Sequence, residues 1–209
     1  MANGILIIDK PQGWTSMDVC AKLRGIFHER RVGHAGTLDP MATGVLTVFL
    51  GEATKLCDLL PNQDKGYTAQ FQLGTVTDTQ DRTGRILSQN SLPISREMLA
   101  EILPRFTGDI CQLPPMYSAV QVGGRRLYDL AREGAEIERT PRRITVYSLK
   151  LTSYDELTRQ GILEIRCSKG SFVRTIVHDI GQALGCGGML TALRRTEASG
   201  FLLRDCLTL

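Results

Sequence analysis

Apolar and polar residues alternate with a period of two between positions 67 and 73. The apolar members of this pattern are Tyr67, Ala69, Phe71 and Leu73, and the polar members are Thr68, Gln70 and Gln72. Such alternation predicts a half-buried β-strand. Continuous apolar runs at residues 4–8 and 45–50 are short enough for buried strands, and further strands are predicted over residues 85–89, 144–151 and 162–167.

Apolar residues spaced by three and four positions predict the helices. One helix begins after Thr15, because Thr15 and Asp18 have the spacing of a capping box, and we expect Val19, Leu23, Ile26 and Phe27 to face inward. Another begins after Ser95 and directs Leu99, Ile102 and Leu103 to the core. Residues 52–60 also suggest a helix, with Leu56, Leu59 and Leu60 facing inward.

The clearest helical pattern follows residues 169–171. Ser171 is the expected N-cap, and Gly185 is expected to end the helix. Its apolar positions are Val173, Ile176, Val177, Ile180, Ala183 and Leu184. Lys169 and Arg174 would then lie near a helix N-terminus, where backbone N–H groups already favour an anion. Because cations oppose the dipole there, they suggest a negative partner, either a phosphate or the carboxylate of Asp39.

The stretch VGHAGTLDPMATG, residues 32–44, predicts a sharp loop that carries one acid, Asp39. Its glycines permit backbone angles closed to other residues, and Pro40 restricts the residue before it. Because the loop leads into the buried run at residues 45–50, it would hold the carboxylate on a rigid base, as an active site requires. The alternative is that Asp39 only opens a turn before proline.

Two other polar segments interrupt the pattern. Residues 74–84 form a loop longer than packing requires, and loops of this kind are often functional. Residues 108–134 combine a proline-stiffened run, a Gly-Gly turn and a short basic helix that Gly134 ends, which suggests an arm projecting from the core.

Composition limits the class of protein. The chain has 209 residues, of which 42% are hydrophobic and 22% charged, which is enough apolar content for one main domain with a proper core. We expect a cytoplasmic protein, because no apolar run could cross a bilayer and the N-terminus lacks the pattern of a secretory signal. The six cysteines are widely spaced without a Cys-x-x-Cys pair, which argues against disulfides and against a zinc site.

The net charge of +3 is concentrated in one segment. Residues 121–150 contain seven basic and four acidic side chains, whereas the rest of the chain contains 18 of each sign. This segment either meets phosphate or is simply a solvated charged surface.

Several single residues allow two interpretations. Lys10 and Trp14 could bind a ligand, although packing against the start of the first helix is the simpler use of Trp14. His34 has no evident partners for a metal site and is expected in a turn. Tyr67 is either a core aromatic or a platform for stacking a base, and His178 is expected to be structural or solvated.

Five segments occur in the order found in one known family. They are DKPQGWTS, GHAGTLDPMATG, DKGYTAQFQLG, QLPPMYSAVQVGGRRLYDLAREG and IRCSKGSFVRTIVHDIG. Together they cover nearly the whole chain, which thereby resembles the bacterial tRNA pseudouridine synthase B family. The resemblance implies an α+β fold with a mixed, largely antiparallel sheet, flanking helices and a central active-site cleft.

The resemblance also implies a reaction. The family converts uridine 55 in the T loop of tRNA to pseudouridine without metal or cofactor, by breaking the bond from ribose C1′ to base N1 and remaking it to C5. Asp39 matches the catalytic aspartate, acting as nucleophile at C1′ or as base at C2′. Arg174 matches the arginine paired with it, and a paired arginine can lower an acid's pKa by about 1–3 units. Tyr67 matches the tyrosine that stacks on the flipped base.

Further matches concern substrate contacts. His34 matches the histidine that takes the place vacated by the flipped uridine, while Lys10, Lys169 and Leu193 match active-site or contact positions. The arm at about residues 108–143, including Arg125 and Arg126, corresponds to an RNA-gripping insertion in a catalytic domain of residues 1–209. The expected partner is therefore the T-arm stem-loop of tRNA, with no membrane, no required protein partner and a monomeric chain.

The sequence departs from the family pattern in two places. Phe172 stands at a contact position where many members carry tyrosine, so a contact through that hydroxyl is absent or supplied elsewhere. Many members also continue beyond the position of Leu209 into a further RNA-binding region, which we expect this chain to lack.

Two other function classes compete with this interpretation. One is a non-catalytic protein that folds or binds tRNA on the same scaffold, in which Asp39 would be dispensable. The other is a phosphohydrolase with an aspartate nucleophile, which is disfavoured because no second acid follows Pro40 to complete a magnesium site.

Overall fold

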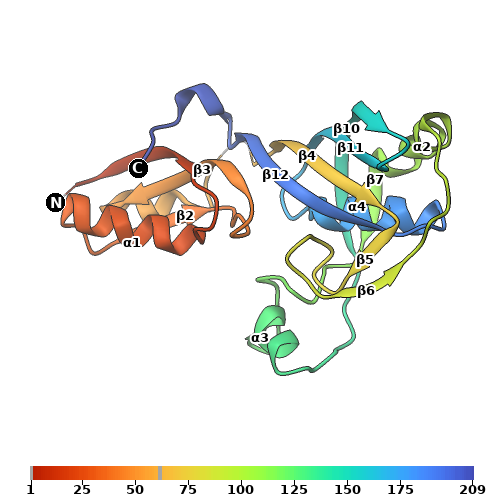
Figure 1. Cartoon of the computed structure of the whole chain (residues 1–209). Helices are drawn as coiled ribbons and strands as arrows, with labels where there is room; N and C mark the ends of the chain where they lie inside the picture. Colours follow the sequence, from red (N-terminus) through yellow and green to blue (C-terminus); the bar gives the residue numbers. More distant parts are fainter. Residues whose placement is uncertain (1, 61–62) are drawn as a thin grey trace. The chain divides into compact units, whose positions relative to one another are not determined.

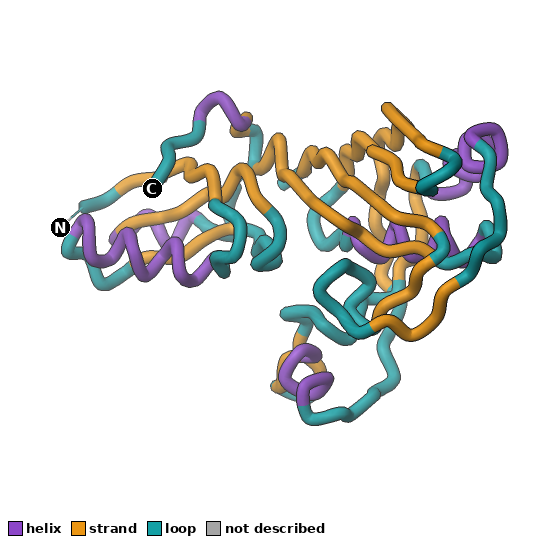
Figure 2. The backbone as a smooth tube through the Cα atoms, viewed as in Figure 1, coloured by secondary structure: helices purple, strands orange, loops and turns teal. Residues whose placement is uncertain are grey.

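The structure is a computed structural model of the chain and describes residues 2–60 and 63–209. It divides into two compact units, one formed by Met1–Thr68 with Ala192–Leu209 and the other by Ala69–Thr191. Strands β4 (Lys65–Leu73) and β12 (Gly188–Ala198) each contribute residues to both units. Figure 1 and Figure 2 show the elements of each unit along the chain.

The first unit is a small sheet covered by one helix. Its strand order is β1-β3-β12-β4, with β2 paired to β3 and β13 to β12. Strand β12 runs parallel to β3, whereas β1 and β2 are antiparallel to it. The elements that lie wholly in this unit are β1 (Gly4–Lys10), α1 (Ser16–Phe27), β2 (Val32–Ala35), β3 (Thr43–Leu50), β13 (Phe201–Leu202) and the 3-10 helices η1 (Gly51–Leu56) and η3 (Leu203–Asp205).

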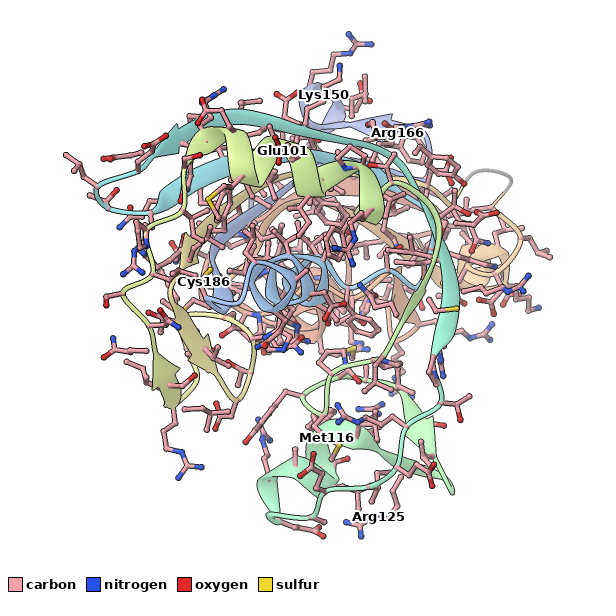
Figure 3. All side chains as sticks on the ribbon, turned by 90° about the vertical axis from the view of Figure 1, so that its right-hand side faces the viewer. Glu101, Met116, Arg125, Lys150, Arg166 and Cys186 are labelled. Carbon is pink, nitrogen blue, oxygen red and sulfur yellow. The ribbon has the colours of Figure 1, made fainter. Side chains whose placement is uncertain are left out.

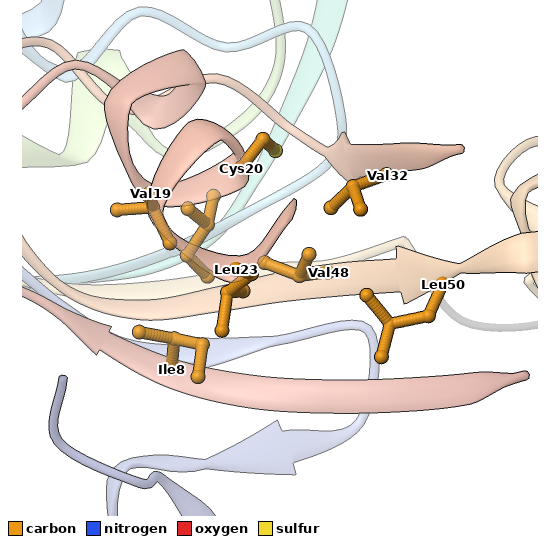
Figure 4. Close-up of a cluster of buried hydrophobic side chains, with 8 residues drawn as sticks. Ile8, Val19, Cys20, Leu23, Val32, Val48 and Leu50 are labelled. Carbon is orange, nitrogen blue, oxygen red and sulfur yellow. The ribbon is translucent and has the colours of Figure 1, made fainter. Parts of the chain in front are cut away.

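One face of β1 and β3 packs against α1. The buried cluster joins Val19, Cys20 and Leu23 of the helix to strand residues such as Ile8 and Val48, and Figure 4 shows these side chains meeting. Trp14 packs against the same cluster, which confirms its structural use. The predicted capping box is also confirmed, because Asp18 N donates to Thr15 Oγ1 and Thr15 N to the Asp18 carboxylate.

Three expectations for this unit are wrong. Ile26 and Phe27 are exposed, although they continue the apolar spacing of α1. Residues 51–56 form a 3-10 helix rather than an α-helix over 52–60, and Leu56 and Leu59 are exposed. Residues 32–35 form strand β2, so the loop occupies only residues 36–42.

The second unit contains the remaining part of the same strand order, β12-β4-β11-β10-β7. The antiparallel pairs β11–β10 and β10–β7 account for its outer half. Its other elements are β5 (Thr75–Thr77), β6 (Ile86–Gln89), α2 (Arg96–Ile102), η2 (Leu103–Phe106), β7 (Gly108–Gln112), β8 (Gln121–Val122), β9 (Arg125–Arg126), α3 (Leu127–Arg132), β10 (Arg142–Asp155), β11 (Gln160–Cys167) and α4 (Val173–Ala183).

The predicted pattern of this unit is largely confirmed. The odd-numbered apolar residues of β4 are buried, as the alternation requires, and Ser95 Oγ accepts from Met98 N at the start of α2. Gly123 and Gly124 both have positive φ and join β8 to β9 in a tight turn that favours glycine. The result is the predicted mixed, largely antiparallel α+β fold.

Asp179 of α4 provides a pH-dependent test of packing in this unit. It is half-buried, and burial raises the pKa of its carboxyl from 3.8 to about 6. The folded state therefore holds the proton more tightly than the unfolded state, and this stabilisation is lost as the pH rises from about 4 to about 6. We expect Asp179→Asn to raise the free energy of unfolding by about 1–3 kcal/mol at pH 7.5 and by little at pH 4.

Urea unfolding at both pH values measures this effect. The matched control is Asp155→Asn, because Asp155 is an exposed acid whose pKa is lowered by hydrogen bonds from Thr158 and Leu157. Asp155→Asn should lower the free energy of unfolding at pH 7.5, because it removes a charge that these hydrogen bonds stabilise. An equal change in Asp179→Asn at both pH values would contradict burial of the charge as the cause.

Candidate active site

Asp39 lies on the loop of residues 36–42 that connects β2 to β3. Its side chain is half-buried, whereas its neighbours Leu38 and Met41 are buried. A turn closes around it, since Ala42 N donates to Asp39 O at 3.0 Å. The loop is therefore anchored by apolar side chains on both sides of a partly accessible carboxylate.

Polar contacts from the start of α1 fix the same loop. The buried Ser16 hydroxyl accepts from Leu38 N at 2.9 Å and lies 3.3 Å from Leu38 O, to which it donates. Gly13 N donates to Pro40 O at 2.8 Å. These contacts hold the backbone on either side of Asp39, so the position of the carboxylate is preorganised.

Lys10 supports the loop from the end of β1. Its side chain is fully buried, and Nζ donates to the carbonyls of Trp14 at 2.5 Å, Pro11 at 3.0 Å and Pro40 at 3.4 Å. Burial lowers the pKa of Lys10 to about 8, while the negative charge of Asp39 opposes that shift. The ammonium thus lies within electrostatic reach of Asp39 and favours its ionised form.

This arrangement predicts a pH-dependent rate for whatever reaction Asp39 supports. As the pH rises through about 8, Lys10 loses its proton, and the positive charge beside Asp39 disappears. The rate should therefore fall above pH 8, and Lys10→Met should be about 10- to 100-fold slower at pH 7 without that decline. The free energy of unfolding should instead rise between about pH 8 and 10.5, because the unfolded chain binds the Lys10 proton more tightly than the folded chain does.

Rate profiles from pH 6.5 to 9.5 for both proteins measure the effect. Lys22→Met, which removes an exposed lysine of α1, is the control. A wild-type rate that is unchanged up to pH 9.5 would contradict a requirement for the Lys10 charge.

His34 lies on β2, opposite Val48 of β3, and not in the turn that we expected. Its ring is half-buried, and burial together with the charge of Arg195 lowers its pKa. The imidazole is therefore neutral at pH 7. Its Nδ1 is buried without a hydrogen-bond partner among the described residues.

Tyr67 and Leu193 lie on strands that also belong to the first unit. Tyr67 on β4 and Leu193 on β12 are both buried, with exposed fractions of 7% and 9%. The unit therefore contains five of the predicted site residues, namely Lys10, His34, Asp39, Tyr67 and Leu193.

Arg174 belongs to the second unit, near the start of α4. Its guanidinium is buried, donating from Nη2 to Tyr117 O at 2.6 Å and from Nη1 to Thr79 O at 3.3 Å. Nη1 also lies 3.8 Å from the carboxylate of Asp81 in a buried ion pair. The sequence pattern suggested a phosphate or Asp39 as the negative partner of Arg174, whereas the carboxylate found beside it is that of Asp81 in the 74–84 loop.

Asp81 was not singled out from the sequence. Its Oδ1 accepts from Thr79 Oγ1 at 2.8 Å, Thr83 N at 2.8 Å and Thr83 Oγ1 at 2.6 Å, which leaves Oδ2 facing Arg174. The unusual length of the loop was the available signal, because the extra residues wrap around this one carboxylate. Nearby, Thr175 of α4 donates to Gln80 at 2.6 Å, which ties the loop to the helix.

The N-cap of α4 is Phe172, so the assignment of Ser171 is wrong. Ser171 Oγ instead donates to Ser168 O at 2.9 Å. The buried side chain of Gln112 on β7 takes over part of the capping, because it accepts from Phe172 N at 2.8 Å and donates to Phe172 O at 3.0 Å. A contact over 60 positions has no local sequence signal. Lys169 is exposed in the preceding turn.

The remaining predicted residues, Arg125 and Arg126, lie on β9 in the arm that carries α3 (Figure 1). Figure 3 shows Arg125 on this arm, well away from Lys150 and Arg166 on the sheet. The guanidinium groups of Arg126 and Arg132 lie 5.9 and 5.2 Å from the centre of the Tyr128 ring. A hollow of about 540 Å³ is lined by Arg125, Arg126 and Arg132 together with acidic side chains.

The structure also bears on the other candidate sites. Within residues 2–60 and 63–209, no group of three His, Cys, Asp or Glu side chains is placed to hold a metal ion. No helix in these ranges is long and apolar enough to cross a membrane. His178 is half-buried in α4, where burial lowers its pKa, in keeping with a structural role.

Comparison with known families gives two matches. Residues 24–173 match the family described as "TruB family pseudouridylate synthase (N terminal domain)". Residues 174–209 match the "tRNA pseudouridylate synthase B C-terminal domain".

Individual relatives agree with these matches. The chain is 49% identical over 209 residues to a tRNA pseudouridine synthase B of Heliobacterium modesticaldum, covering 99% of this chain and 68% of that protein. It is also 49% identical over 210 residues to the protein of the same name from Opitutus terrae, covering 99% of this chain and 86% of that one.

A solved structure of a Cbf5-Nop10-Gar1 complex contains a chain with a similar fold. The TM-score is 0.76 at 29% identity, over 99% of this chain and 52% of that chain. An archaeal box H/ACA sRNP Nop10-Cbf5 complex gives a TM-score of 0.72 at 26% identity, over 98% and 51% of the two chains. The chain therefore spans about half the length of these solved relatives.

Proposed function

Because the chain belongs to the TruB family of pseudouridylate synthases, we propose that it isomerises uridine 55 in the T loop of tRNA to pseudouridine. The observation that carries this proposal is the preorganised Asp39, held on an anchored loop beside the buried ammonium of Lys10. The enzyme is a tRNA pseudouridine synthase, an isomerase.

The reaction defines what Asp39 must do. The bond from ribose C1′ to N1 of uracil breaks, the base turns, C1′ joins C5, and the proton of C5 is lost while N1 regains one, so that the atoms balance. Ionised Asp39 either attacks C1′ or removes the proton at C2′, and both routes need a carboxylate that stays charged when water is excluded. Lys10 supplies a nearby positive charge that favours this state.

Arg174 is proposed to act as the charged partner of the Asp39 carboxylate in the reaction. The support for this role is that the guanidinium is held in one orientation within the second unit. It donates to the carbonyls of Tyr117 and Thr79 and pairs with the carboxylate of Asp81. A guanidinium offers five donors, so these contacts leave it capable of further hydrogen bonds to a carboxylate.

Tyr67 and His34 are proposed to stabilise the RNA while the target uridine is flipped out. Extrusion of a base costs a few kcal/mol, and stacking on an aromatic side chain returns about 1–3 kcal/mol. Tyr67 would provide the stacking surface and assist proton removal from C5. His34, neutral at pH 7, would fill the place that the uracil leaves in the T loop without bringing a charge into the stack.

The remaining predicted residues are proposed to bind the T-arm stem-loop. They include Lys169, Phe172 and Leu193 at the catalytic domain, and Arg125 and Arg126 on the RNA-gripping arm of residues 108–143. The stacking of Arg126 and Arg132 on Tyr128 supports this role, because it holds cationic groups on an exposed segment. We further propose that the chain acts in the cytoplasm as a monomer, without cofactor or protein partner.

The test is to map pseudouridine in a full tRNA transcript incubated with the protein. Carbodiimide labelling followed by primer extension should show one new stop, at position 55, and none in a transcript with cytidine at that position. RNA binding without any modification would contradict the proposal and favour a non-catalytic tRNA-folding protein on the same scaffold.

A further inference from the structure

Arg195 of β12 is a fully buried cation that the proposed reaction does not use. Its exposed fraction is 0%, so its charge has no direct contact with solvent. Nε donates to Val45 O at 2.7 Å, and Nη2 donates to Gly36 O at 3.0 Å. Nη1 is buried without a hydrogen-bond partner among the described residues.

The two carbonyls that Arg195 binds lie at the two ends of one loop. Gly36 begins the segment that carries Asp39, and Val45 follows shortly after it, at the start of β3. The guanidinium therefore joins the first residue of the loop to the strand that follows the loop. Ser16 and Lys10 bind the middle of the same loop, at Leu38 and Pro40. Together with the contacts of Arg195, the loop backbone is therefore held at its ends and at its middle.

The backbone around Arg195 is shaped to allow this contact. Strand β12 pairs with β3 so closely at Gly44 that a Cβ there would lie 2.1 Å from Arg195 O. Gly44 also has a φ of 101°, which favours glycine. Gly36, with a φ of 69°, turns its carbonyl to Nη2.

The energetic cost of burying the Arg195 guanidinium suggests that the residue has a function. Burying a charge is unfavourable, and a buried donor left without a partner costs about 1–3 kcal/mol. A hydrophobic residue would pack β12 against β3 without either cost. The positive charge of Arg195 is also felt at Lys10 and His34, because it lowers the pKa of both.

We propose that Arg195 is a positioning residue for the isomerisation, which clamps the two ends of the Asp39 loop and so fixes the catalytic carboxylate. The inference rests on the proposed function of Asp39. Arginine is required because its planar fork reaches two carbonyls at once, whereas lysine keeps the charge on a single terminal nitrogen.

The matched test compares Arg195→Lys with Arg194→Lys. Arg194 is the preceding residue of β12 and also bridges two acceptors, Asp9 at 2.7 Å and Thr43 Oγ1 at 3.1 Å, but neither lies within the loop. Single-turnover tritium release from a T-arm stem-loop labelled at C5 of uridine 55 gives the rate, and filter binding gives the affinity for the same RNA.

We expect Arg195→Lys to slow the single-turnover rate about 10- to 100-fold, because small displacements of a catalytic group have effects of that size. Its affinity for the stem-loop should stay within about 2-fold, and Arg194→Lys should keep its rate within about 3-fold. Arg195→Met, which also loses the charge, should be slowed at least as much as Arg195→Lys. A thermal unfolding measurement on each variant serves as the check that it is folded.

The outcomes separate the two claims. If the wild-type protein releases no tritium, the proposed function fails. If the wild-type protein is active and folded Arg195→Lys keeps its rate within about 3-fold, Arg195 does not position the loop. If Arg195→Met does not fold, Arg195→Lys alone decides. Equal losses in the rate and in the affinity for RNA would also overturn the inference, because they indicate a general distortion.

Discussion

Asp39→Asn is expected to lower the single-turnover rate of isomerisation by at least about 10³-fold while tRNA affinity changes little. Asparagine has nearly the same shape and keeps the turn around Pro40, but it can neither attack C1′ nor accept the proton of C2′. Acid–base catalysis alone contributes about 10²–10⁴-fold, and both chemical routes depend on this one carboxylate. The Ser16 hydroxyl and Gly13 N bind backbone groups of the loop, not the Asp39 side chain, so these contacts should survive the substitution.

The control for this substitution is Asp9→Asn. Asp9 is a partly buried acid of the same unit, and its carboxylate pairs with Arg194 at 2.7 Å. Removing that charge should leave the rate within about 3-fold, since ion pairs that solvent can reach contribute about 0–1 kcal/mol. A similar loss in both variants would indicate that charge in this unit matters in general and that Asp39 has no special role.

Arg174→Met is expected to abolish isomerisation and to destabilise the protein by about 3–5 kcal/mol. The loss of stability follows because Asp81 would remain as a buried charge without its partner. The loss of activity follows if the same guanidinium also pairs with Asp39. Urea unfolding and single-turnover rates measure the two effects independently.

A second substitution separates stability from activity. In Asp81→Asn combined with Arg174→Met, no uncompensated charge is buried, and the asparagine oxygen can still accept from Thr79 and Thr83. We expect most of the stability to return while the protein stays inactive. Recovery of the rate along with the stability would show that Arg174 has only a structural role.

Much of the fold follows from local patterns in the sequence. The alternation in β4, the capping box of α1 and the Gly-Gly turn between β8 and β9 each depend on neighbours a few residues away, and each is confirmed. Errors arise where burial depends on distant elements. Ile26 and Phe27 continue the helical pattern of α1, yet both are exposed.

The candidate site also combines residues that a local sequence pattern marks with residues that depend on distant partners. Asp39 stands out because glycines and a proline surround it, and the resemblance to a known family supports its role. Asp81, Gln112 and Arg195 each bind a partner at least 60 positions away, and apart from the length of the 74–84 loop no local pattern marks them. Their roles depend on strand pairing, which a single sequence does not reveal.

The most direct test of the account is tritium release from a T-arm stem-loop labelled at C5 of uridine 55, with wild-type protein and Asp39→Asn compared under single-turnover conditions. The account predicts one equivalent of tritium released per stem-loop by the wild-type protein, and a rate at least about 10³-fold lower for the variant at saturating RNA. A variant that releases tritium at the wild-type rate would contradict it.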